Sequence, residues 1–219
     1  KFHSALALLL LAFLSYFPIS AESYLMDNVG ISLYAGAAVP VVGDYTQYDK
    51  ITDLLALGPH FGLGLSYYFT EQLGIEGSFH YEFNYFKEKY RFAGTEPVRT
   101  QLYFLAGLIY YFDEMLSEKD IRPFARAGIG LYNWAFREDG LASDASTNAP
   151  GGFKSTDFGI NIGAGVDFKL LEDLTAGLVL DFNMYFPKDE LKFGYFFAEQ
   201  GTLSPRIKIS YFIPTSDDY

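Results

Sequence analysis

Hydrophobic and polar residues alternate with a period of two along most of the chain. In FGINIGAGVDF, residues 158–168, every second residue from Phe158 to Phe168 is apolar, and the residues between them are small or polar. A period of two predicts a β-strand whose two faces differ in polarity. The alternation recurs seven more times, so we expect eight strands. They cover residues 29–39, 60–69, 73–85, 98–112, 125–132, 158–168, 174–186 and 203–211.

The segments that join these strands alternate between long and short. Long loops are expected at 41–57, 87–96, 137–155 and 187–201, and shorter turns at 70–72, 113–121 and 169–173. Long and short connections at opposite ends are typical of a barrel that spans an outer membrane, whereas a β-sandwich has no reason to sort its loops in this way. The pattern therefore predicts an all-β fold, a transmembrane antiparallel up-and-down β-barrel of eight strands.

The size of the side chains decides which face of each strand points inward. An eight-stranded barrel has an interior just wide enough for side chains to fill. The apolar faces carry more than two dozen large side chains, which would overfill that space, while the alternate faces are rich in Gly, Ser and Asn. We expect the apolar faces to meet lipid, and the alternative is a soluble lipocalin-like carrier. Aromatic residues near strand ends, expected at the membrane interfaces, are Tyr67, Phe69, Tyr110, Phe112, Phe168 and Phe186.

Charged residues fall on the expected inward faces and are absent from the apolar sets. Buried charges persist when they are paired and hydrogen-bonded, so we expect a network of ion pairs that plugs the lumen. The alternative is a gated ion path lined by the same groups. The ten residues are Glu76, Glu82, Arg99, Arg122, Arg126, Asp157, Asp167, Asp181, Arg206 and Lys208. The expected pairs are Glu82 with Arg99, Arg126 with Asp167, and Asp181 with Arg206 or Lys208.

The first residues have the features of a secretory signal. An uncharged apolar run from Ala5 to Phe17 follows a short basic start, and Ala21 offers a small residue at a cleavage point. The run has 13 residues, fewer than the ~20 that a spanning helix needs, which disfavours a transmembrane anchor. We expect residues 1–21 to be removed and residues 22–219 to form the barrel domain.

Composition and charge exclude several classes of protein. Without Lys1 the chain has 15 basic and 27 acidic residues, a net charge of about −12. It has no basic patch, so we expect no nucleic-acid partner. It has no cysteine, which excludes a disulfide scaffold and a thiolate metal site. No later segment holds ~18 uninterrupted apolar residues, so no membrane helix is expected.

One group of residues has the composition of a catalytic triad. Ser78, His80 and Glu82 share one face of the strand at 73–85 and offer a nucleophile, an imidazole and a carboxylate. Residues i and i+2 on a strand lie ~6.5–7 Å apart, and this face is the lumen, whereas a lipid-acting site has to open toward lipid. The chain has no phosphate loop, HExxH motif or EF-hand. We therefore expect no catalytic residue, no cofactor and no metal site.

Three segments resemble the small eight-stranded outer-membrane proteins, the OmpA transmembrane domain and the OmpW group. RPFARAGIGLY at 122–132 is similar to the family strand that begins with an Arg-Pro-aromatic step and continues into Gly-x-Gly. Residues 58–79 resemble the second hairpin of these proteins, and residues 157–182 resemble the hairpin of strands six and seven. The resemblance spans nearly all of 28–212 and implies a place in the bacterial outer membrane.

The resemblance also implies partners. The protein is expected to be a monomer that contacts outer-membrane lipids and lipopolysaccharide and is inserted by the outer-membrane assembly machinery. Family barrels often end on an aromatic residue that this machinery recognises, and the candidates here are Tyr211–Phe212 and Tyr219. OmpA-type chains often continue into a peptidoglycan-binding domain, which is not expected here. OmpW-like members are associated with the passage of small hydrophobic molecules. The charged lumen expected here argues against the same function for this chain.

The function expected from the sequence is non-enzymatic. We expect a structural or surface-interaction protein whose lumen is largely plugged by ion pairs. A small porin or OmpW-like channel for small solutes is the alternative, and a lipid A-modifying enzyme is a third. The four long loops contain no readable motif, so the sequence predicts no solute or receptor.

Overall fold

The computed structural model describes residues 27–44, 50–91, 96–112, 121–137, 154–187, 191–192, 195–196 and 199–214. The predicted signal segment 1–21, most of the loop at 137–155, and Tyr219 lie outside these residues. Eight long strands correspond to the eight predicted ones. They are β1 (Asn28–Val42), β2 (Gly58–Tyr68), β3 (Leu73–Tyr85), β4 (Val98–Tyr111), β5 (Ile121–Arg137), β6 (Lys154–Lys169), β7 (Leu174–Phe186) and β10 (Gln200–Pro214).

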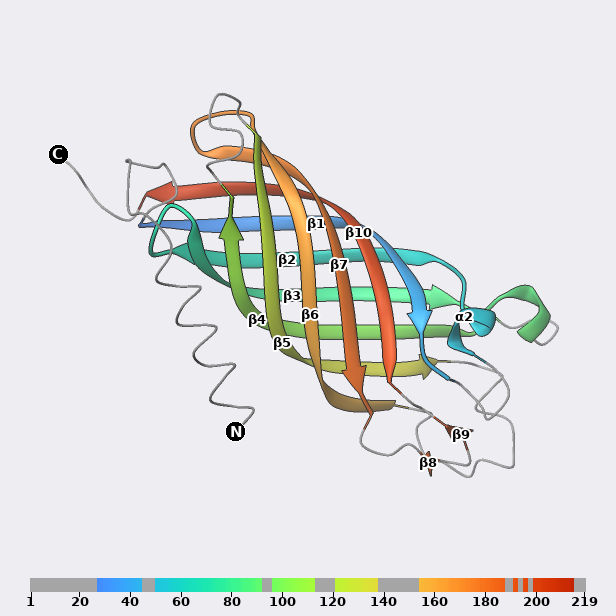
Figure 1. Cartoon of the computed structure of the whole chain (residues 1–219). Coiled ribbons are helices and arrows are strands. Elements are labelled where there is room, and N and C mark those ends of the chain that lie inside the picture. Colours follow the sequence, from blue (N-terminus) through green and yellow to red (C-terminus); the bar gives the residue numbers. More distant parts are fainter. Residues whose placement is uncertain are drawn as a thin grey trace, which may run out of the picture.

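The eight long strands form a closed antiparallel barrel (Figure 1). Each strand pairs with its neighbour in the chain, and β10 returns to pair with β1, so the order around the barrel is β1-β10-β7-β6-β5-β4-β3-β2. The predicted up-and-down topology is therefore confirmed. Closure gives every strand two partners, which removes the unpaired sheet edges that a membrane does not tolerate.

β1, β5, β6 and β10 are clearly longer than the alternation alone predicted, whereas β3 and β7 have the predicted bounds. The fifth strand was expected at 125–132, but β5 covers Ile121–Arg137, and the sixth, expected at 158–168, covers Lys154–Lys169. The added residues lie mainly at the long-loop end of the barrel, the end where β1 ends and β2 begins. Polar side chains such as Asn133 and Lys154 interrupt the apolar pattern there, so the strand continues where the hydrophobic alternation stops.

The apolar faces of the strands point outward. Leu33 is 59% exposed and Leu178 is 56% exposed, whereas Ser32, next to Leu33 in the chain, is 3% exposed. The aromatic residues expected near the interfaces, such as Phe69 and Phe168, are also on the outer surface. The outward assignment is confirmed, and the alternative of a carrier with an apolar interior is wrong.

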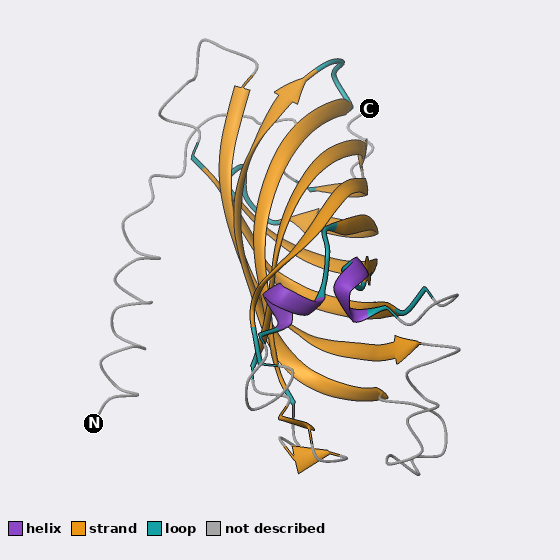
Figure 2. Cartoon of the chain, turned by 90° about the vertical axis from the view of Figure 1, so that its right-hand side faces the viewer, coloured by secondary structure: helices purple, strands orange, loops and turns teal. Residues whose placement is uncertain are grey.

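Two short helices lie together at the long-loop end, α2 (Ile51–Leu54) and η1 (Glu88–Tyr90) (Figure 2). The amino group of Lys87 donates to the carbonyl of Thr52 at 2.7 Å, and the backbone N–H of Lys87 donates to Leu54 O at 2.8 Å. Two further short strands, β8 (Leu191–Lys192) and β9 (Tyr195–Phe196), pair with each other outside the barrel. Within the described residues, no helix has the length and apolar character needed to cross a membrane.

The closing seam between β1 and β10 contains a proline. The described pairs run along β1 from Asn28 to Gly36 and resume at Val39. Pro205 of β10 falls in this interval, and proline has no backbone N–H to donate to a neighbouring strand. The seam therefore carries fewer hydrogen bonds here than on either side.

Candidate functional site: the closed lumen

The centre of the lumen is occupied by a compact group of two arginines and two carboxylates. Arg126 on β5 donates from Nε to Asp181 Oδ1 at 2.6 Å and from Nη1 to Glu76 Oε1 at 3.0 Å. Arg206 on β10 contacts the same Asp181 carboxylate. The four side chains come from four strands, β3, β5, β7 and β10, and their formal charges cancel. We call them the central network.

A pair of histidines lies beside the central network. Arg206 Nη1 is 3.0 Å from His80 Nδ1 and 3.3 Å from His60 Nε2. A guanidinium only donates, so both of these ring nitrogens are assigned as acceptors. His80 Nε2 then donates to Ser78 Oγ at 2.9 Å. The neutral tautomer of each ring is assigned from this arrangement, and both rings hold Arg206 in place.

Toward the long-loop end, further ion pairs and hydrogen bonds fill the lumen. Arg99 Nη2 lies 3.3 Å from Glu82 Oε1 and donates to Asn84 Oδ1 at 2.7 Å. The indole N–H of Trp134 donates to Asp157 Oδ2 at 2.8 Å. The structure thus brings Glu82 and Arg99 together as expected, and it gives Asp157 a neutral donor.

Toward the short-turn end, Lys208 and Asp167 form the main ion pair. Lys208 Nζ is 2.6 Å from Asp167 Oδ2, which also accepts from the Tyr111 hydroxyl at 2.6 Å. Arg122 is half-buried at the rim, where its guanidinium donates to the carbonyl of Glu71 at 3.0 Å and lies over the Tyr111 ring. Arg122 is thus anchored to a turn of the barrel.

The expected ion pair between Arg126 and Asp167 is wrong, and the structure decides between the two partners expected for Asp181. Arg126 bonds Asp181 and Glu76 instead of Asp167, because the strand registers place Asp181 level with Arg126, with only Gly163 between them. Of the two partners considered for Asp181, the structure selects Arg206, while Lys208 goes to Asp167. Sequence position gives the height of a residue along the barrel but not the reach of its side chain across it.

Two glycines make room for buried carboxylates. A Cβ added at Gly163 would lie 2.0 Å from Asp181 Oδ1, and one added at Gly177 would lie 2.1 Å from Asp167 Oδ1. Gly163 is paired directly with Asp181 between β6 and β7, and Gly177 with Asp167. Each carboxylate lies against the neighbouring strand, where the glycine has no side chain to displace it.

Large aromatic side chains also fill the lumen, which was not expected. At the short-turn end one buried cluster contains Tyr34, Tyr68, Ile109, Tyr111, Phe124, Val179 and Phe212. At the long-loop end a second contains Ile51, Leu54, Leu55, Phe86, Tyr103, Leu105, Tyr132, Trp134 and Tyr185. The parity of the alternation was a usable signal, since Tyr68 stands between the outward Tyr67 and Phe69.

The residues of the possible catalytic triad lie together, with one insertion. Ser78 and His80 are hydrogen-bonded, but His60 stands between His80 and Glu82. His80 Nδ1 and His60 Nε2 are 3.1 Å apart, and because both accept from Arg206 they do not hydrogen-bond each other. His60 Nδ1 is then 3.7 Å from Glu82 Oε2. All four residues are buried in the lumen. Among the described residues no group of three or more His, Asp or Glu side chains is arranged to hold a metal ion.

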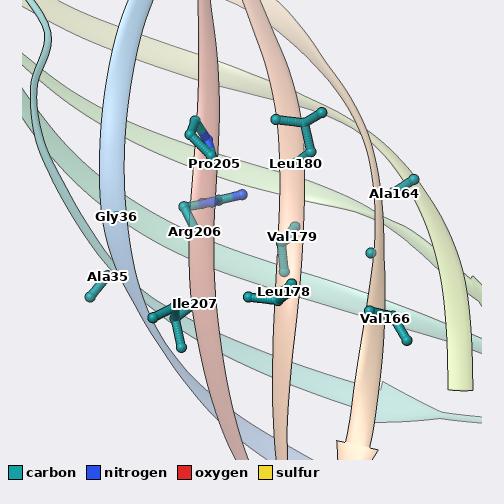
Figure 3. Close-up of a pocket in the computed structure, with 11 residues that line it drawn as sticks. Ala35, Gly36, Ala164, Val166, Leu178, Val179, Leu180, Pro205, Arg206 and Ile207 are labelled. Carbon is teal, nitrogen blue, oxygen red and sulfur yellow. The ribbon is translucent and has the colours of Figure 1, made fainter. Parts of the chain in front are cut away.

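An apolar groove of about 670 Å³ lies on the outer wall across β1, β10, β7 and β6 (Figure 3). The groove forms because small residues on β1 and β6 lie beside larger aliphatic residues on β7 and β10. Outward side chains that line it are Ala35, Ala164, Val166, Leu178, Leu180, Pro205 and Ile207. These side chains are hydrocarbon, so the groove is part of the outer apolar surface.

Comparison with solved structures agrees with the barrel geometry. Neisserial surface protein A shares 13% identity, with a TM-score of 0.54 over 84% of this chain and 96% of that chain. OprG from Pseudomonas aeruginosa shares 15% identity, with a TM-score of 0.53 over 88% and 99%. Ail, the attachment invasion locus protein of Yersinia pestis, shares 14%, with a TM-score of 0.50 over 86% and 99%. At these identities the likeness concerns the fold alone.

The sequence comparisons place the chain in a family. No curated protein sequence matches it. The profile of the outer membrane protein beta-barrel domain matches residues 5–196, most of the chain. Together with the closed eight-stranded barrel and its apolar outer surface, this match shows that the chain belongs to the outer membrane protein β-barrel domain family, whose place is the bacterial outer membrane.

Proposed function

We propose that this protein is a non-catalytic barrel that presents a surface outside the cell and whose lumen is closed to solutes. The observation that carries the proposal is the continuous filling of the lumen. The central network is bounded on both sides by buried clusters of aromatic and aliphatic side chains. A solute crossing the barrel has to displace all three layers.

The central network supports closure because its charges compensate one another. Arg126 and Arg206 share Asp181, and Arg126 also bonds Glu76. Separating a buried ion pair leaves each charge desolvated and unpaired, which costs about 3–5 kcal/mol when one partner is removed. Thermal motion therefore opens this layer rarely, and the resting barrel is closed at its centre.

The lengths of the strands support a surface role. A tilted strand of about 9–11 residues spans the hydrocarbon layer. β5 has 17 residues and β6 has 16. In outer-membrane barrels the short turns face the periplasm and the longer loops face outward, so the extra residues of β5 and β6 raise the barrel wall on the extracellular side. This wall and its loops are the surface that we propose for interaction.

Planar-bilayer recording of the full protein tests closure. The wild type is expected to show no steady conductance, because the central network blocks the path. Arg126→Ala removes the shared cation, and it is expected to produce measurable openings. Gly77→Ala is the matched control, since a Cβ there meets nothing within 4 Å on the outer wall. Steady wild-type conductance that Arg126→Ala or Asp181→Ala abolishes would contradict the proposal.

That contradicting result would support the second candidate, a small channel. The observation in favour of a channel is that the centre is closed by side chains that have alternative partners. Asp181 already contacts both Arg126 and Arg206, so a shift of one arginine toward Glu76 exchanges pairs without leaving a charge alone. Rings of charged side chains in a pore select the ions that pass, so an exchange of this kind at Asp181 would open a charge-selective path.

The absence of catalysis is tested separately. The Ser78 hydroxyl bonds His80 inside the lumen, where the closed layers keep substrate away. Mass spectra of lipid A from cells that express the wild type and Ser78→Ala are expected to be identical. A change in acylation or sugar substitution that depends on Ser78 would assign the lipid-modifying activity instead.

A further inference from the structure

The extracellular end of the lumen holds four aromatic rings in a row. Tyr103 and Tyr132 stack at 4.8 Å between ring centroids with a 20° angle between planes. Tyr132 and Tyr185 follow at 5.5 Å and 21°, and Trp134 and Tyr185 at 6.2 Å and 31°. The three tyrosine rings are nearly parallel and the Trp134 ring is tilted against Tyr185, and the four come from β4, β5 and β7. We call Tyr103, Tyr132, Trp134 and Tyr185 the aromatic shelf.

Polar atoms without partners lie beside the aromatic shelf. Gln101 is paired directly with Trp134 between β4 and β5 and is 0% exposed. Among the described residues, neither Oε1 nor Nε2 of Gln101 has a hydrogen-bond partner. The same holds, within that part of the chain, for Glu82 Oε2 and for Nε and Nη1 of Arg99. Buried polar atoms are nearly always hydrogen-bonded, so these atoms point to a ligand.

The cover over this site is apolar and is contributed by the segment that contains α2. Ile51, Leu54 and Leu55 are buried in the same cluster as the aromatic shelf. Aliphatic side chains bury the rings well, but they offer no hydrogen bond to Gln101 or Arg99. In the covered state, burial of these polar atoms without hydrogen bonds therefore costs free energy. A polar ligand, or water, that bonds them removes this cost.

The chemistry of the site selects among ligand classes. An apolar molecule satisfies the rings but leaves Gln101 unpaired. An anion meets the carboxylates of Glu82 and Asp157, and a cation meets the guanidinium of Arg99. A neutral sugar ring has an apolar face that stacks on aromatic rings and hydroxyls that donate to and accept from an amide.

We propose that the aromatic shelf together with Gln101 and Arg99 binds one neutral sugar unit at the extracellular mouth, and that α2 is the cover it displaces. This site goes beyond the closed barrel proposed above, because the central network and the periplasmic cluster stay shut while α2 moves. Binding therefore occurs without conductance, and the two proposals fail separately.

Besides its buried side chains, the cover is held by backbone contacts that can be locked. Ala56 N–H donates to Tyr85 O at 2.8 Å, next to the isolated bridge between Leu55 and Phe86. Residues that face each other across an antiparallel bridge are close enough for a disulfide. The chain contains no cysteine, so Ala56→Cys with Tyr85→Cys gives a single defined pair. Neither substitution changes the aromatic shelf.

Intrinsic fluorescence reports on the site directly, because Trp134 is the single tryptophan of the chain. Glucose and N-acetylglucosamine are titrated into the full protein in micelles, with glucose 6-phosphate and glucosamine as charged counterparts. A saturable change in Trp134 emission is expected for the neutral sugars. Its dissociation constant is expected on the order of millimolar, as for a ligand of about a dozen heavy atoms. The charged sugars are expected to bind at least about tenfold more weakly.

The variants separate this site from other sugar contacts. The oxidised Ala56→Cys, Tyr85→Cys protein is expected to lose the response and to regain it on reduction. Gln101→Leu is expected to lose it as well, whereas Ser210→Ala, in the periplasmic half of the lumen, is expected to keep it. Heat-modifiable migration on gels confirms that each variant is folded. No saturable response in the wild type, or an equal response in the locked protein, overturns the proposal.

Discussion

The two ends of the lumen are both closed by buried apolar side chains, but they are closed by different means. At the periplasmic end every member of the cluster lies on a strand of the barrel. At the extracellular end the cluster includes Ile51, Leu54 and Leu55, which belong to the connection between β1 and β2. A strand residue leaves its place only when the ladder breaks, whereas a connecting segment can move while the barrel stays intact. The periplasmic end is therefore a fixed wall and the extracellular end a cover.

The largest expected effect lies in the periplasmic cluster. Phe124 packs against Tyr111 and lies under the amino group of Lys208. Phe124→Ala is expected to lower the free energy of unfolding by about 3–5 kcal/mol, because it leaves a cavity among residues that cannot move inward. Urea-dependent folding into lipid vesicles measures this quantity.

The matched control for this change is on the outer surface. Phe168→Ala removes the same side chain from a position that is exposed on the outer wall. Its effect is expected to be well below that of Phe124→Ala, since lipid fills the space. Equal losses at the two positions would show that the periplasmic cluster is not a packed wall.

An intermediate effect is expected where a glycine faces a carboxylate. Gly163→Ala places a methyl group against Asp181 and forces the central network to shift. Overpacking of this kind costs about 1–3 kcal/mol. The same folding measurement applies, and the outward Gly77→Ala is expected to change little. An unchanged free energy of unfolding in Gly163→Ala would mean that the central network rearranges at no cost. The barrel interior would then be as movable as the α2 segment, against the comparison drawn above.

The smallest global effect is expected in the cover. Leu54→Ala removes one of the three buried side chains of the α2 segment, and the free energy of unfolding is expected to fall by less than about 1 kcal/mol because local opening is separate from global unfolding. Local exposure is expected to rise, so acrylamide should quench Trp134 more strongly. A large global loss with unchanged quenching would place α2 in the wall instead.

The barrel itself was predictable from the sequence because a strand with one lipid-facing side has a strict period of two. The ends of the strands were not, since β5 continues past Leu131 to Arg137 with the polar Asn133 on its outward face and with Tyr132 and Trp134 on its inward face. The α2 segment was interpreted as part of a polar loop, although Ile51, Leu54 and Leu55 have the i, i+3, i+4 spacing of an apolar helical face. That spacing was the available signal.

The contents of the lumen were only partly predictable. Glu82 and Arg99 are near neighbours on adjacent strands, so their height along the barrel was enough to pair them. The partner of Arg126 was missed because it lies two strands away on β7, and the pair depends on the strand registers and on Gly163, between them, leaving room for Asp181. The missing hydrogen bonds of the Gln101 amide could not be predicted from the sequence, because they depend on which side chains lie around it in the folded barrel.

Pro205 has a consequence for how the first and last strands meet. The seam is continuous on the periplasmic side and interrupted toward the outside, and a register shift follows between Pro40 and Val42. If the chain is pulled apart by its termini, the force reaches the densely bonded part of the seam first. The barrel should therefore resist mechanical unzipping from the periplasm and yield more readily to a strain applied from outside the cell.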